Sequence, residues 1–164
     1  IIMKKLLACL LFSLALHAQS FEKKTYTDAS GHVLPYQILM PANYNPSVKY
    51  PVVLVLHGAG ERGDDNAAQM KYGAPVFLNA ENREKYPAIV IFPQCPKDSY
   101  WSSVTIDRTT KPTTFLFNYT SEANWPLQSA VDLVKSFVKD KKNSFIVVCG
   151  LPLPQLQRLY WKEW

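Results

Sequence analysis

The chain has 164 residues, of which 48% are hydrophobic and 19% charged, and this composition excludes an intrinsically disordered segment, which cannot bury enough apolar surface to fold. The formal net charge of +5 is spread without long basic runs, so the chain lacks the footprint of a nucleic-acid-binding protein. The length fits one domain, and it equally fits part of a larger one, because sheet-based α/β domains often need about 200 residues or more.

The first twenty residues (1–20) are typical of an export signal. Two lysines precede the apolar run of residues 6–16, and small residues follow at Ala18 and Ser20. This run is too short to span a bilayer comfortably, so we expect a cleaved signal peptide rather than an anchor. The sequence therefore predicts a secreted or periplasmic protein with no membrane contact after cleavage.

The mature chain is expected to open with a β-hairpin. Residues 21–27 and 33–40 alternate polar and apolar side chains, and the turn-forming residues 28–31 join them. Such alternation is typical of strands that keep one face in water. We therefore place an antiparallel hairpin at the start of the sheet.

Three later segments predict buried parallel strands. They are continuous runs of β-branched and other apolar residues at 51–56, 88–92 and 145–149. Strands buried on both faces have this pattern, and parallel neighbours need crossovers that are usually helical. The fold class is therefore α/β, with a mostly parallel sheet.

The intervals between these strands supply the crossovers. A helix is expected over roughly residues 66–79, although Gly73 and Pro75 break it or make it rich in loop. A second helix follows from the spacing of one apolar face, formed by Leu127, Ala130, Val131, Val134 and Val138. The predicted order is β-β-β-α-β-α-β. Between Pro93 and Trp125 we expect a long irregular stretch rich in aromatic residues.

Residues 57–66, here called the glycine loop, follow directly on the first buried strand. Gly58, Gly60 and Gly63 let the backbone turn sharply and bring N–H groups close to a ligand, as stabilising a tetrahedral oxyanion requires. The simpler interpretation is a strand-to-helix turn that binds a phosphate or nothing at all. A lone histidine such as His57 is more often structural than catalytic.

The glycine loop, written His-Gly-Ala-Gly-Glu-Arg-Gly-Asp-Asp-Asn, is followed by a strand ending in Phe92-Pro93-Gln94-Cys95-Pro96 and then by Trp101. This order of motifs resembles the secreted α/β-hydrolases called predicted peptidases or carboxylesterases. They lie near the phospholipase/carboxylesterase and polyhydroxyalkanoate-depolymerase-like groups. The resemblance covers about residues 21–150 and implies the N-terminal half of an α/β-hydrolase fold.

The resemblance also implies a function and a site. The function is that of a serine hydrolase, which cleaves a small ester, a peptide or a polymer through an acyl-enzyme. By position, the oxyanion hole would consist of the residues Ala59 and Gly60, supported by His57, Gly58 and Gly63. The candidates for contact with substrate in the crevice are Glu61, Arg62 and Trp101.

The family's nucleophile is missing from its expected place. It belongs on a Gly-x-Ser-x-Gly turn after the strand at residues 145–149, but Pro152 occupies the serine position and no histidine follows His57. No catalytic residue is therefore present, and we expect this chain to be inactive. The tail, residues 151–164, does not resemble the family, which suggests a frame change or a premature end.

Several alternatives stay open. The chain could be a secreted, non-catalytic module that holds a glycan or a peptide through its aromatic loop. No cluster of residues with metal-ligand spacing is present, so we expect neither a metal nor a cofactor. An export route would permit a disulfide between Cys95 and Cys149, yet two cysteines without a recognisable spacing are more often separate buried thiols. The substrate and the oligomeric state cannot be deduced.

Overall fold

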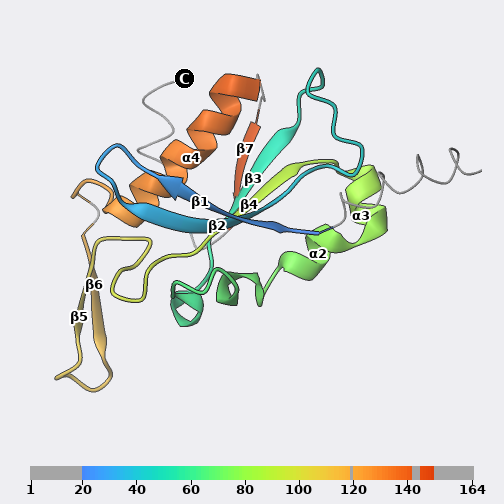
Figure 1. The fold of residues 1–164 in the computed structure, drawn as a ribbon. Helices are drawn as coiled ribbons and strands as arrows, with labels where there is room; N and C mark the ends of the chain where they lie inside the picture. The colour runs from blue at the N-terminus through green and yellow to red at the C-terminus, as the bar shows by residue number, and fades with distance from the viewer. Residues whose placement is uncertain (1–19, 119, 142–144, 150–164) are drawn as a thin grey trace, which may run out of the picture.

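The computed structural model describes residues 20–118, 120–141 and 145–149. They form an α/β structure with a five-stranded sheet, short helices on one face and a long helix on the other (Figure 1). The signal-peptide prediction for residues 1–20 and the tail at residues 151–164 concern residues outside these ranges, apart from Ser20. Within the described ranges, no helix is long and apolar enough to cross a membrane.

The sheet has the strand order β1-β2-β4-β3-β7. The strands, in chain order, are β1 (Glu22–Thr27), β2 (Val33–Leu39), β3 (Pro51–Val55), β4 (Ile89–Pro93) and β7 (Phe145–Cys149). β1 and β2 form the antiparallel hairpin, and β2 pairs antiparallel with β4. β3 pairs parallel with both β4 and β7. All five predicted strands are present, with ends shifted by at most one residue, and β3, β4 and β7 run parallel as expected.

The long helix α4 (Trp125–Lys141) covers one face of the sheet. Its residues Leu127, Val131 and Val134 are fully buried and belong to the same apolar cluster as Val52 and Leu54 of β3. Burying each such side chain contributes about 1.5–3 kcal/mol. The apolar stripe predicted for this helix therefore packs into the larger of the two apolar clusters that form the core.

The opposite face is covered by short elements. These are the 3-10 turns η2 (Ala59–Glu61) and η3 (Ala68–Met70) and the helices α2 (Ala74–Leu78) and α3 (Ala80–Lys85). Val53, Val90 and Phe92 point to this side because neighbouring residues of a strand face opposite ways. The helix predicted over residues 66–79 is broken at Gly73, as expected, since Gly73 takes a φ of 88° and separates η3 from α2.

The region between β4 and α4 corrects the prediction of an irregular loop. It contains an antiparallel hairpin of β5 (Val104–Asp107) and β6 (Thr114–Phe117), so the order β-β-β-α-β-α-β lacks two strands. The hairpin projects away from the sheet in Figure 1 and pairs only with itself. Phe115, Leu116 and Phe117 remain exposed on it.

The turn of the β1–β2 hairpin is fastened to the start of α4. The Asp28 carboxylate accepts hydrogen bonds from His32 Nδ1 at 2.9 Å and from Ser129 Oγ at 2.8 Å. The His32 ring stacks on Trp125, with 4.6 Å between ring centroids. These contacts fix the long helix against the edge of the sheet.

Candidate functional site

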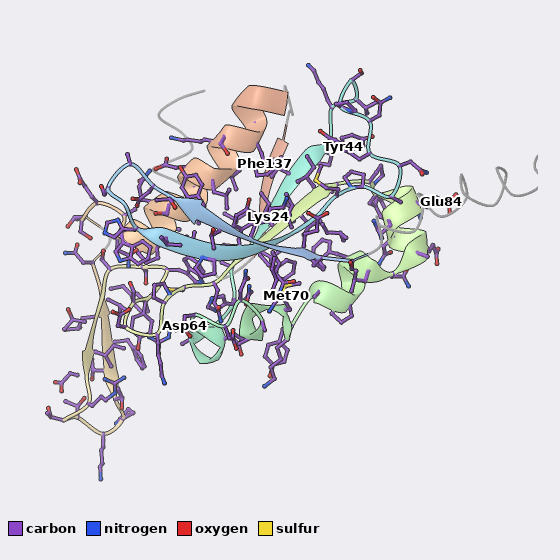
Figure 2. All side chains as sticks on the ribbon, viewed as in Figure 1. Lys24, Tyr44, Asp64, Met70, Glu84 and Phe137 are labelled. Atoms are coloured by element: carbon purple, nitrogen blue, oxygen red, sulfur yellow. The ribbon has the colours of Figure 1, made fainter. Side chains whose placement is uncertain are left out.

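The glycine loop leaves the sheet at the carboxyl end of β3. The parallel strand β7 ends at the same edge, since Val55 is paired with Cys149. Figure 2 shows Asp64 of the loop at this edge, and Tyr44 lies near the opposite end of the sheet. Loops that follow parallel strands converge at the carboxyl edge, which is where open α/β sheets hold their ligands.

His57 is fixed by two hydrogen bonds to the backbone. Its Nδ1 lies 2.6 Å from the carbonyl oxygen of Gly58, and its Nε2 accepts the N–H of Cys95 at 2.9 Å. This pattern requires a neutral ring protonated at Nδ1. Burial lowers the pKa of His57 below its usual value of 6.5, against the opposing effects of the Gly58 carbonyl and Glu61. With both nitrogens engaged, His57 orders the loop and has no nitrogen available to act as a base.

Trp101 and Arg62 hold the loop from the side. The Trp101 indole is 8% exposed, donates from Nε1 to the carbonyl oxygen of His57 at 3.1 Å and contacts the His57 ring edge-on. Arg62 donates to the carbonyl oxygens of Ala59 at 2.8 Å and Ser99 at 2.9 Å. Its guanidinium also lies 3.9 Å from the centre of the Tyr100 ring. Both side chains therefore support the loop, and their contact with substrate stays a prediction.

The backbone N–H groups of Ala59 and Gly60 are two adjacent candidate donors to a ligand. They stand at the start of η2, where a helix has no internal acceptor for its first donors. Both residues are exposed, and no hydrogen bond within the described part of the chain uses either N–H. Glu61, by contrast, donates its N–H to the carbonyl of Gly58 at 3.3 Å. Two adjacent donors on exposed residues therefore have no acceptor in the described part of the chain, at the carboxyl edge of the sheet.

A network around Gln94, which the sequence analysis did not select, lies beneath the loop. Gln94 follows β4 directly and is completely buried. Its Nε2 donates to the Asp65 carboxylate at 2.8 Å and to the Glu61 carbonyl at 3.2 Å, and its Oε1 accepts the N–H of Asn66 at 2.7 Å. The next residue, Cys95, accepts the N–H of Gly63 at 2.9 Å. The only signal in the sequence was a polar residue directly after a buried apolar run.

Cys95 is a free, buried thiol. Burial raises the pKa of Cys95 to about 12, so the thiol stays protonated and cannot act as a nucleophile. β3 lies between β4 and β7, which separates those two strands by about 9–10 Å. Cys95 therefore does not form the disulfide with Cys149 that the sequence analysis left open. It is a separate buried thiol.

No hydroxyl is activated by a histidine within the described ranges. Ser103 donates to the carbonyl of Glu122, and Ser121 donates to that of Asn118. No group of histidine, cysteine, aspartate or glutamate in these ranges could hold a metal ion. Pro152, at the position expected for the nucleophile, lies outside the described residues.

An apolar hollow of about 690 Å³ lies elsewhere, on the face covered by α2 and α3. Its walls include Leu39, Val53, Phe77 and Val90, and its rim includes Pro51 at the beginning of β3. Because β3 runs from Pro51 toward the glycine loop, this hollow lies at the other end of the strand. It is therefore separate from the candidate site.

Comparison with solved structures places this geometry in a known fold. A thermostable esterase shares 30% sequence identity with the chain, with a TM-score of 0.63 over 81% of the chain and 34% of the esterase. The chain adopts part of the α/β-hydrolase fold. It spans about a third of that esterase's length.

A CE1 ferulic acid esterase from the anaerobic fungus Anaeromyces mucronatus is also similar, at 15% identity and a TM-score of 0.46, over 82% of the chain and 50% of the esterase. No protein-family model matches the chain, and no curated protein matches it.

Proposed function

We propose that the chain provides the oxyanion-binding side of a hydrolase that acts on carboxylic esters. The observation that carries this proposal is the pair of unused N–H groups at Ala59 and Gly60, held where β3 and β7 end side by side. The similarity to a thermostable esterase over most of the chain favours an ester over a peptide as substrate. The same donors would serve a peptide carbonyl, which stays the second substrate class.

The chemistry follows from the position of the donors. When a nucleophile attacks an ester carbonyl, the oxygen becomes negatively charged, and rigid N–H groups stabilise it without having to reorganise. Removing one such donor typically costs about 2.7–4 kcal/mol of transition-state stabilisation. His57 contributes by keeping the loop ordered, since its two nitrogens are already bonded.

We further propose that the polypeptide of this sequence does not turn over esters by itself. Pro152 carries no nucleophilic group, and no histidine follows His57 in the sequence. Binding and an oxyanion hole alone give only a small acceleration over water. Incubation with p-nitrophenyl acetate and with a fluorophosphonate probe tests this: we expect no turnover and no labelling, and stoichiometric labelling of a serine would overturn it.

The oxyanion role is tested by deleting one donor. Ala59 is the first residue of η2, and Gly58 before it is extended, with φ −77° and ψ 177°, so Ala59→Pro removes the N–H in a conformation that proline accepts. Ala80→Pro is the matched control, because Ala80 begins α3 after the extended residue Asn79. Methylphosphonate, a tetrahedral anion, is titrated while amide chemical shifts are recorded.

We expect methylphosphonate to shift the Ala59 and Gly60 amide signals in the wild-type chain. The apparent affinity for methylphosphonate, measured from the Gly60 shift, should fall at least about tenfold in Ala59→Pro. It should stay unchanged in Ala80→Pro. Equal binding by all three proteins, or binding elsewhere on the chain, would overturn the oxyanion role.

A second candidate function is a non-catalytic module that binds a glycan or a peptide. The observation that favours it is the β5–β6 hairpin, whose register places Val104, Ile106, Phe115 and Phe117 on one face. Phe115 and Phe117 are 53% and 47% exposed, and exposed aromatic side chains are typical of binding surfaces. Titration with xylo-oligosaccharides and peptides distinguishes the candidates: binding that Phe115→Ser abolishes, without any methylphosphonate effect at Gly60, would favour the module.

Export is proposed from the sequence alone. Residues 1–20 have the charge, apolar run and small residues of a signal peptide. Expression in a bacterial host, followed by N-terminal sequencing of the periplasmic fraction, tests it. We expect a mature chain that begins at or near Phe21, and an unprocessed cytoplasmic product would contradict the proposal.

A further inference from the structure

We propose that Gln94 is a positioning residue that sets the geometry of the glycine loop through its side-chain amide. This inference rests on the proposed oxyanion role of Ala59 and Gly60. The Gln94 side chain bonds to neither of these residues directly, and it acts through the loop segment from Glu61 to Asn66.

The amide of Gln94 matches its surroundings at both ends. Its NH₂ group donates to two acceptors, the Asp65 carboxylate and the Glu61 carbonyl, at 2.8 and 3.2 Å. Its oxygen accepts one donor, the N–H of Asn66, at 2.7 Å. A buried amide with both ends satisfied holds its partners in one arrangement, because losing any bond leaves a buried polar group unpaired.

The space around this amide is also closed. A Cβ atom at Gly63 would lie 3.1 Å from Gln94 Nε2, so the loop backbone passes directly over the side chain. The Gln94 backbone N–H is itself anchored to the carbonyl of Pro35 in β2 at 2.8 Å. The side chain therefore connects the rigid sheet to the middle of the loop.

Asp65 completes the arrangement on the far side. Its carboxylate accepts the N–H groups of Ala67 and Ala68 as well as the Gln94 amide, and these bonds lower the pKa of Asp65 below its usual value. A carboxylate at residue 94 would face this charge, whereas a protonated carboxyl could donate to it as glutamine does. At residue 94, a side chain that donates a hydrogen bond to Asp65 should therefore behave differently from one of equal size that cannot donate.

Two variants of the full chain test the inference. Gln94→Glu keeps the size and exchanges the NH₂ group for an oxygen, and Gln94→Met keeps the approximate volume without hydrogen bonds. Gln128→Met, which removes an amide that donates to Asp132 on α4, is the control. The readouts are hydrogen exchange at the Gly63 N–H, which bonds to Cys95 and not to the Gln94 side chain, and the Gly60 amide shift with methylphosphonate.

We expect exchange at Gly63 to rise about tenfold or more in Gln94→Met at every pH, since buried partners are left unpaired. In Gln94→Glu the same rise at neutral pH should reverse as the pH falls and residue 94 becomes protonated. Gln128→Met should leave Gly63 unchanged. A role limited to filling space predicts normal exchange in both Gln94 variants, and that result would overturn the inference.

The methylphosphonate titration separates this inference from the proposed function. If the wild-type chain does not respond at Gly60 while Gly63 exchange depends on Gln94, the oxyanion role fails and the ordering role of Gln94 stands. If the wild-type chain responds and both Gln94 variants respond equally, Gln94 does not position the donors. The inference requires the Gly60 response to weaken in Gln94→Met and to recover at low pH in Gln94→Glu.

Discussion

The neutral state of His57 predicts a specific dependence of stability on pH. Nε2 accepts the Cys95 N–H and Nδ1 bonds to the Gly58 carbonyl, so a second proton on the ring would break the bond to Cys95. Burial lowers the pKa of His57 in the folded chain below 6.5. The unfolded chain therefore binds more protons below about pH 6.5, and the free energy of unfolding falls as the pH falls.

The size of this effect can be bounded. Between pH 6.5 and pH 5, a histidine that stays neutral in the folded chain can lose at most about 2 kcal/mol of stability. Part of the ring reaches solvent, which screens its charge, so we expect a loss of about 1 kcal/mol. Urea unfolding followed by tryptophan fluorescence at pH 7.5, 6.0 and 5.0 measures it.

The variant His57→Gln isolates the contribution of this ring. It should be less stable than wild type at pH 7.5, by about 1–3 kcal/mol, and should lack the additional loss at pH 5. His32→Gln, which changes the ring at the hairpin turn, should retain that additional loss. If the wild-type chain and His57→Gln lose the same free energy between pH 7.5 and 5, the neutral, doubly bonded His57 is refuted.

Three further predictions concern stability. Leu127→Ala, at a fully buried position of α4, should cost about 2–5 kcal/mol in urea unfolding, and a change below 1 kcal/mol would contradict the packing of that helix. Gly63→Ala should lower the stability by about 1 kcal/mol because its Cβ would lie 3.1 Å from Gln94 Nε2, whereas Gly60→Ala, with open space around the new atom, should leave the melting temperature nearly unchanged. Partial burial raises the pKa of Asp28, but hydrogen bonds from Ser129 and His32 outweigh it and lower the pKa to about 2. The stability that these hydrogen bonds add should be lost as the pH falls from about 4 to 2. Asp28→Asn, measured at pH 5 and pH 3, should not show this loss of stability.

The three parallel strands could be predicted because strands buried on both faces have a continuous apolar sequence pattern. Residues 51–55, 89–93 and 145–149 are apolar and rich in β-branched residues, and they are the three parallel strands. The β5–β6 hairpin could not be found in this way, because its strands pair only with each other and most of their side chains are exposed. A pattern of burial cannot identify an element that buries little.

The glycine loop could be located from the sequence, but its supports could not. Three glycines after a buried strand mark a sharp turn, and the structure places that turn at the carboxyl end of β3. The partners of Gln94 lie 28 to 33 residues earlier in the chain, and no local pattern reports a contact over that distance. The identity of the supporting side chains therefore depends on tertiary structure.

The hydrogen bonds of the loop are distributed unevenly, and this distribution carries the functional argument. Both nitrogens of His57, the guanidinium of Arg62 and the carboxylate of Asp65 are bonded within the protein. The adjacent N–H groups at Ala59 and Gly60, on exposed residues at the start of η2, have no protein acceptor in the described residues. Ordering a backbone costs conformational entropy, so a rigid loop that leaves two adjacent donors unused gives up stability that a simple turn would keep. A tetrahedral anion bound at those donors would compensate that loss.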